Sequence, residues 1–271
     1  MTQYLLGIDN GCTVSKAGLF TLDGQEVAVA SAKSELLCPH PGWQERDMGA
    51  MWEQTSAAIQ DVIRKADVDA KQIISVACTG HGNGLYLVDK QGDPVRPAIL
   101  STDSRAQSIA AQWLADGLDK VVRPKTMQSL WAAQPNTLLA WLLEHEPEVM
   151  KKAGWVLMAK DYIRFKLTGK IQAELTDFSA TSLMDLNTRQ YDDTLFEAFG
   201  IADTRDLMPP IVRSTDLCGE ITTEAAAATG LKAGTPVAGG LFDIDACGLA
   251  CGVIDDSQLC MVVGTWGNNQ Y

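Results

Sequence analysis

The sequence predicts an α/β fold in which helices flank a mixed β-sheet. Short apolar runs that end at glycine-containing turns alternate along the chain with longer segments of helical periodicity. The sequence has no repeat at a solenoid period and no low-complexity linker. Strands that come first and then alternate with helices are typical of a sheet covered by helices.

The first 33 residues predict three strands. An apolar run at Tyr4–Ile8 ends at Asp9-Asn10-Gly11, a second spans Ser15–Leu22, and a third follows Asp23-Gly24. Asp9 therefore stands at the end of a strand, where a carboxylate can hold Mg²⁺ through water. Asp, Asn and Gly are also favoured in tight turns, so an ordinary hairpin is the alternative interpretation.

The middle of the chain predicts helices separated by short strands. The periodicity favours helices at residues 48–66, 104–116, 136–145, 160–167, 192–199 and 222–229, and strands at 73–78, 84–89 and 155–158. Asp103 is placed to cap the second of these helices, and Gly169 is placed to end the fourth.

Two glycine turns mark the carboxyl-terminal part. Gly239-Gly240-Leu241-Phe242-Asp243 opens a run of small residues at 244–252, and the apolar run 259–263 leads to Gly264-Thr265. This order predicts turn, helix, strand and turn. A carboxylate at the first turn, beside backbone N–H groups that can bind an anion, suits phosphoryl transfer to a hydroxyl. A buried Asp that caps a core helix is the alternative.

Net charge, hydropathy and cysteine content indicate which partners the protein is not expected to bind. The formal net charge of −12 disfavours non-specific binding to nucleic acid, which needs clustered Lys and Arg. The sequence shows no signal peptide and no apolar run of membrane-spanning length. Its seven cysteines include no Cys-x-x-Cys pair, and no His lies near Cys247 and Cys251, which disfavours a metal site. We expect a cytoplasmic protein with reduced thiols and no nucleic-acid or membrane partner.

Eight segments, in order and spacing, resemble the motifs of the FGGY carbohydrate kinases. They are residues 6–13 with Lys16, 41–47, 79–84 with 87–89, 97–100 with Asp103 and Arg105, 138–147, 160–162 with 167–169, 176–181, and Asp243 with 264–265. The resemblance implies an actin-like ATPase fold, related to ribonuclease H, with ATP and Mg²⁺ as cofactors. Residues 41–48, 218–222, 239–243 and 264–266 are most similar to the L-xylulose kinase branch.

The resemblance also implies a role for each candidate site residue. Asp243 falls on the family's catalytic base, with Asp245 as its local rival, and Asp9 falls on the partner of Mg²⁺. The residues that would line the phosphate path are Asp9, Gly11, Thr13, Lys16, Gly264 and Thr265. Those that would meet or support the sugar are His81, Asn83, Asp103, Arg105 and Asp243. Two alternatives stay open: His81 makes a structural hydrogen bond in a turn, and Asp103 simply pairs with Arg105.

The implied reaction is ATP-dependent phosphorylation of a terminal hydroxyl of a small sugar, a ketopentose such as L-xylulose. Cys12 stands where the family usually has Thr, and Asn83 stands where the xylulose kinases often have His, so another ketopentose or a polyol (xylulose, ribulose, erythritol, glycerol) remains an alternative. So does a non-catalytic sugar sensor of the same fold.

The family's length implies a second domain. We expect residues 1–250 to form the substrate-binding domain and residues 251–271 to begin an ATP-binding domain that is truncated here. The chain alone would then be inactive, and a homodimer remains open.

Overall fold

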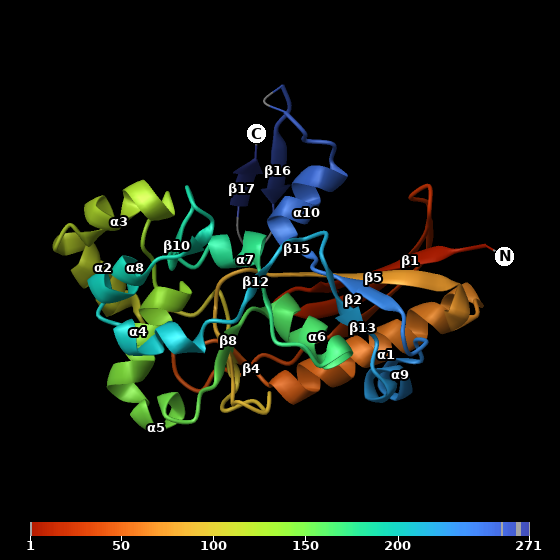
Figure 1. Ribbon diagram of the computed structural model, residues 1–271, viewed down its shortest axis with the longest axis horizontal. Coiled ribbons are helices and arrows are strands. Elements are labelled where there is room, and N and C mark those ends of the chain that lie inside the picture. The colour runs from red at the N-terminus through yellow and green to blue at the C-terminus, as the bar shows by residue number, and fades with distance from the viewer. Residues whose placement is uncertain (1, 256, 264–266, 271) are drawn as a thin grey trace.

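A seven-stranded mixed sheet is the frame of the molecule (Figure 1). The computed structural model describes residues 2–255, 257–263 and 267–270. The sheet contains β1 (Tyr4–Asn10), β2 (Val14–Thr21), β3 (Glu26–Lys33), β5 (Ile73–Gly80), β13 (Leu217–Glu220), β14 (Pro236–Ala238) and β15 (Leu241–Phe242). Strands β1, β14 and β15 all pair with β5 in parallel, whereas β2, β3 and β13 add antiparallel pairs at the two sides.

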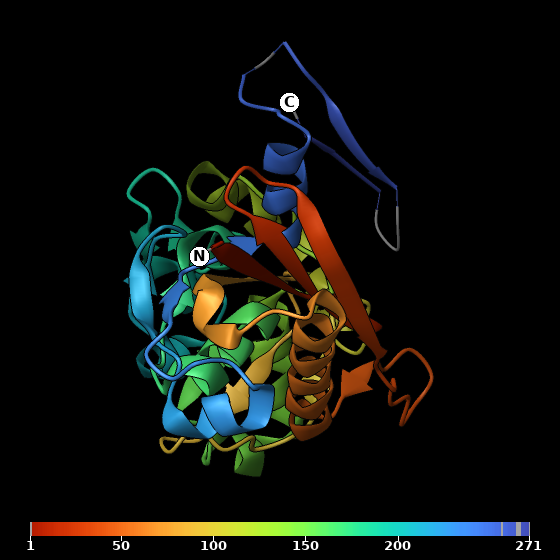
Figure 2. The same ribbon diagram turned by 90° about the vertical axis from the view of Figure 1, so that its right-hand side faces the viewer.

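Helices cover the sheet. The long helix α1 (Met48–Ala66) packs against β2 and β3, α6 (Ala159–Thr168) packs against β5, and α9 (Thr223–Thr229) packs against α1. Figure 2 shows the orange helix α1 running beneath the red strands. On the other side, α10 (Asp243–Ala250) and the hairpin of β16 (Cys260–Val263) and β17 (Gly267–Gln270) project away from the sheet (Figures 1 and 2).

A second apolar core lies beside the sheet. Its helices are α2 (Gln107–Ala115), α3 (Leu118–Thr126), α4 (Pro135–His145), α5 (Pro147–Met150), α7 (Leu175–Ser179) and α8 (Asp193–Ala198). Among the described residues, four further pairs of short strands lie among these elements or join them to the sheet region. The short strands are β4 (Glu45–Arg46) with β7 (Ala98–Ile99), β6 (Tyr86–Val88) with β8 (Trp155–Leu157), β9 (Ala173–Glu174) with β12 (Ile211–Val212), and β10 (Met184–Asp185) with β11 (Gln190–Tyr191). Two 3₁₀ turns, at Ala70–Gln72 and Ala202–Leu207, complete the fold. None of the described helices is long and apolar enough to cross a membrane.

Local sequence explains the helix that organises the sheet. Asp47 precedes α1, and its side chain accepts a hydrogen bond of 2.7 Å from the N–H of Ala50, which satisfies a free donor of the first turn. Met51, Ile59 and Val62 recur at helical spacing and are fully buried against the sheet. The helix ends at Asp67, whose backbone is left-handed. The predicted limits of 48–66 are confirmed.

Other predictions need correction. Asp103 does not cap a helix, because α2 begins only at Gln107 and Ala106 stands at its N-cap without a side-chain bond. The carboxylate of Asp103 instead accepts hydrogen bonds from Arg105 and from the N–H of Gln44. Helix α3 was not predicted from the periodicity, since it contains Pro124 inside its last turn.

The turn before α10 requires two glycines. Gly240 has φ = +85°, and a Cβ there would lie 2.0 Å from the carbonyl oxygen of Cys78 in β5. A Cβ on Gly239 would lie 2.2 Å from the carbonyl oxygen of Arg213. The chain can therefore come back beside β5 and form β15 only because no side chain stands at either position.

We expect Gly240→Ala to lower the free energy of unfolding by about 3 kcal/mol or more, because a left-handed backbone and a backbone clash coincide. Gly230→Ala is the matched control: Gly230 has φ = +77° but no atom within 4 Å of its added Cβ. It should lose only about 1–2 kcal/mol. Urea denaturation of both variants measures the difference, and equal losses would contradict the claimed close approach.

Candidate active site

Three parallel strands bring candidate residues to one edge of the sheet. Thr79 of β5 is in register with Asp9 of β1 on one side and with Leu241 of β15 on the other. The carboxyl ends of parallel strands share an edge, so Asp9, His81 and Asp243 all lie at or just beyond it. Residues far apart in the sequence thus meet where α/β sheets commonly bind ligands.

Asp243 is the first residue of α10 and is half-buried. Burial raises the pKa of its carboxyl group to about 6, and the neighbouring carboxylates of Asp9 and Asp245 add to this effect. His81 and the N–H of Ile244 oppose it. A carboxylate of this pKa is mostly ionised at neutral pH, yet it is a stronger proton acceptor than an ordinary Asp. The pKa of the rival Asp245 is also raised, again mainly by burial.

Asp9 forms an ion pair with Lys16. The two residues face each other across the β1–β2 pairing, and their side chains approach to 3.1 Å. About one-third of the Asp9 side chain is exposed (32%), so the carboxylate stays accessible from the edge of the sheet. In the part of the chain that the structure describes, no three His, Cys, Asp or Glu side chains gather as a metal site.

Hydrogen bonds from the turn itself and from a buried arginine fix the turn between β1 and β2. The N–H of Gly11 donates to the carbonyl oxygen of Val14, and Thr13 is exposed at the tip. The buried guanidinium group of Arg46 donates to the carbonyl oxygen of Gly11 at 3.1 Å and to Ser15 Oγ at 2.9 Å. The sequence marked Arg46 only as part of the segment 41–47. Nothing in the local pattern showed that its side chain would support this turn.

The turn after β5 carries His81 and Asn83. His81 is buried, with Nε2 lying 2.8 Å from the hydroxyl of Tyr86, a partner that the sequence did not reveal. This contact agrees with the structural alternative for His81. Asn83 has φ = +59°, and its Oδ1 atom is buried without a hydrogen-bond partner among the described residues. An unpaired acceptor at this turn is free to receive a ligand hydroxyl.

A close contact joins this turn to the Asp243 segment. A Cβ on Gly82 would lie 2.3 Å from the ring of Phe242, so the ring occupies the space above the glycine. Because Phe242 immediately precedes Asp243, the turn of Asn83 and the half-buried carboxylate are fixed relative to each other.

Asp103 and Arg105 form a buried ion pair near Glu45 and Trp43. Both side chains are fully buried and they pair at 2.9 Å, as in the alternative left open above. Arg105 also pairs with Glu45 at 2.7 Å, and its guanidinium carbon lies 4.1 Å from the ring centre of Trp43. The pair therefore supports the segment around Trp43. The remaining candidates, Gly264 and Thr265, lie outside the described residues.

Comparisons with known proteins identify the family. The chain belongs to the FGGY family of carbohydrate kinases, whose N-terminal domain matches residues 4–250. It is 43% identical over 266 residues to the L-xylulose/3-keto-L-gulonate kinase of Escherichia coli K12, covering 98% of this chain and 53% of that protein. It is 36% identical to a probable L-xylulose kinase of Pasteurella multocida, covering 97% of this chain and 55% of the relative.

Solved structures of sugar kinases share the fold of this chain. The xylulose kinase of Rhodospirillum rubrum superposes with a TM-score of 0.90 at 28% identity, covering 98% of this chain and 55% of the other. A ligand-bound xylulose kinase from Lactobacillus acidophilus gives a TM-score of 0.90 at 25% identity, with 98% and 53% covered. The predicted actin-like ATPase fold is confirmed. The chain spans about half the length of the relatives it matches.

The raised pKa of Asp243 predicts a stability effect. An ionised carboxylate with a folded-state pKa near 6 is less favourable in the folded than in the unfolded chain, so it destabilises the fold above pH 6. Asp243→Asn removes this charge, and we expect the variant to gain on the order of 1–3 kcal/mol at pH 8. The gain should shrink as the pH falls from about 6 to about 4 and approach zero near pH 3, where the carboxyl of the wild type is mostly protonated in both states. Urea denaturation at both pH values checks this; a variant less stable than wild type at pH 8 would contradict the assignment.

Proposed function

We propose that this protein transfers the γ-phosphoryl group of ATP to a terminal hydroxyl of a ketopentose of the L-xylulose type. The main support for this proposal is the half-buried carboxylate of Asp243, which has a pKa raised to about 6 and lies at the same sheet edge as Asp9. The names of the relatives supply the substrate class.

Asp243 would act as the general base. A sugar hydroxyl is too weak an acid to attack phosphorus unaided, so a carboxylate within hydrogen-bond reach must accept its proton. Asn83 Oδ1 would accept a hydrogen bond from a second hydroxyl, which orients the sugar. Asp103 and Arg105 would act indirectly, by holding Trp43 beside the sugar. His81 would keep the turn in place through Tyr86.

Asp9 would hold Mg²⁺ through water. A single partly exposed carboxylate fits this ion, which keeps several waters and is usually bound by one or two carboxylates together with substrate phosphates. When bound, Mg²⁺ would neutralise charge on the phosphates. Lys16, which pairs with Asp9, and the exposed Thr13 would contact phosphate oxygens, together with Gly264 and Thr265, while Gly11 would shape the turn because its N–H already donates to Val14.

The domain division also remains a proposal. Residues 1–250 would form the substrate-binding domain, and 251–271 would lead into the domain that holds ATP. Four large apolar side chains near this end are exposed among the described residues: Leu249, Ile254, Leu259 and Met261. An apolar surface of this kind suits packing against another domain. We place the protein in the cytoplasm, acting on sugar and ATP and without nucleic acid as a partner, as its charge of −12 favours.

Two alternatives belong to the same test. The chain is also 31% identical to an erythritol kinase of Brucella abortus, so a polyol is an alternative substrate. A sugar sensor of the same fold would need neither Asp9 nor Asp243. ADP release by the complete protein, measured with L-xylulose, D-xylulose, L-ribulose, D-ribulose, erythritol and glycerol, separates these possibilities. Turnover highest with a ketopentose supports the proposal, and no ADP release with any acceptor supports the sensor.

Asp243→Asn should lower kcat by about 10³-fold or more while changing sugar affinity little, because the amide cannot accept the proton. Asp245→Asn is the matched control, since it removes a carboxylate of raised pKa two residues away in the same helix. It should keep kcat within tenfold. The coupled ADP assay measures both; the reverse order of losses would transfer the role of base to Asp245.

Asp9→Ala should raise the Mg²⁺ concentration needed for half-maximal activity by about tenfold or more, while the sugar KM changes much less. The reason is that the proposal assigns Asp9 to the metal and phosphates and Asn83 to the sugar. Magnesium titrations at saturating sugar test this. A variant whose only defect was in the sugar KM would contradict it.

A further inference from the structure

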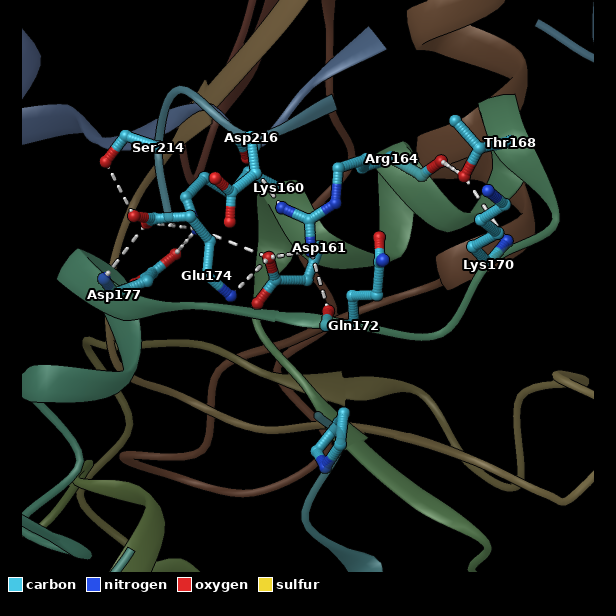
Figure 3. A network of polar contacts seen from close by, with 12 residues as sticks. Lys160, Asp161, Arg164, Thr168, Lys170, Gln172, Glu174, Asp177, Ser214 and Asp216 are labelled. Carbon is cyan, nitrogen blue, oxygen red and sulfur yellow. Dashed lines mark hydrogen bonds and ion pairs between the residues drawn. The ribbon is translucent and has the colours of Figure 1, made fainter. Parts of the chain in front are cut away.

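Five charged side chains form an ion cluster with no exposed surface. Lys160 Nζ lies 3.3 Å from Asp161, 3.1 Å from Glu174 and 3.1 Å from Asp177, and Arg164 pairs with Asp161 at 2.9 Å (Figure 3). We call these residues the buried ion cluster: Lys160, Asp161, Arg164, Glu174 and Asp177. They belong to α6, β9 and α7, outside the candidate site described above.

Such a cluster is a poor way to stabilise a fold. Removing several charges from water costs more than their pairing commonly returns, and apolar replacements are often neutral or stabilising. Burial raises the pKa of Asp177 to about 7, although Lys160 opposes the rise. Apart from the ion pair with Lys160, the carboxylate of Asp177 has no hydrogen-bond partner among the described residues. The cluster therefore calls for a role other than stability.

The cluster reaches the Asp243 segment through three contacts. Arg164 Nη1 donates to the carbonyl oxygen of Gly239 at 2.6 Å. The N–H of Gly240 donates to the carbonyl oxygen of Ser214 at 3.0 Å, and the N–H of Phe242 donates to Thr176 Oγ1 at 2.9 Å. Every contact falls within the four residues before Asp243.

Glu174 is common to two of these contacts. Its carboxylate accepts hydrogen bonds from Thr176 Oγ1 at 2.7 Å and from Ser214 Oγ at 2.8 Å, and it is paired with Lys160. Because the hydroxyl of Thr176 donates to Glu174, its lone pair is directed at the N–H of Phe242. One buried carboxylate thus accepts a hydrogen bond from both residues that hold the segment, Thr176 through its hydroxyl and Ser214 through its backbone carbonyl.

We infer that Glu174 is a positioning residue for the reaction, which fixes the placement of Asp243 through Thr176 and Ser214. The kinetic part of this inference rests on the proposed function. A base must lie within hydrogen-bond reach of its proton, and displacement by about 1 Å can cost about 10²-fold in rate. The ion cluster would supply the rigidity that keeps a carboxylate at the mouth of a turn in place.

Thr176→Val in the complete protein tests the link, because valine keeps the shape and removes the hydroxyl. We expect kcat to fall about 10- to 100-fold with the sugar KM changed less than about threefold. Thr176→Ser, which restores the hydroxyl, should recover most of the turnover. Thr229→Val is the matched control: Thr229 is fully buried, donates to the carbonyl oxygen of Ala225 and accepts from the N–H of Leu231, but it lies in α9. It should keep wild-type kcat.

A second measurement does not depend on activity. Carboxyl ¹³C NMR titration reports the pKa of Asp243, which should move from about 6 towards the ordinary Asp value in Thr176→Val and stay unchanged in Thr229→Val. An unchanged Asp243 pKa in Thr176→Val, an equal loss of kcat in Thr229→Val, or no recovery with Thr176→Ser would each overturn the inference. Absence of turnover in the wild type would refute the proposed function alone, since the titration still decides whether Thr176 places Asp243.

Discussion

The parallel pairing of β5 with β1 on one side and β15 on the other is the constraint on which the site depends. It brings Asp9 and Asp243, which are more than two hundred positions apart in the sequence, to the same edge. The pairing with β15 is permitted only by the absence of a side chain at Gly240, where the backbone meets the carbonyl of Cys78. The pairing of the strands therefore determines which side chains meet at this edge and what chemistry they can perform.

Buried polar groups then hold each side of this edge. Arg46 supports the turn after β1, and the cluster around Lys160 supports the turn before α10. In both places, a cation out of contact with water donates directly to a backbone carbonyl of a glycine. This arrangement fixes backbone positions at both turns, while burial raises the pKa of the half-buried carboxylate of Asp243.

Local signals predicted most of the elements but little of the site's support. Helix α1 was predicted with its limits from the apolar spacing, and the Asp47 cap found in the structure agrees with them, since both depend on neighbouring residues. Asp103 was wrongly expected to cap a helix, because its carboxylate is captured by Gln44 from a segment 59 residues away. The contact of Thr176 with Phe242, 66 residues apart, leaves no periodic signal at all. Side chains that act through tertiary contacts become visible only once the fold brings them together.

In the proposed reaction, a carboxylate of raised pKa, held at this shared edge, accepts the proton of the sugar hydroxyl. The most direct test is the pH dependence of kcat/KM for a ketopentose in the complete protein, which reports the ionisation of the free enzyme's base. We predict an acid limb with an apparent pKa of about 6, within about one unit. An acid limb near the ordinary Asp value of about 4, or a rate that does not change between about pH 5 and 7, would contradict it.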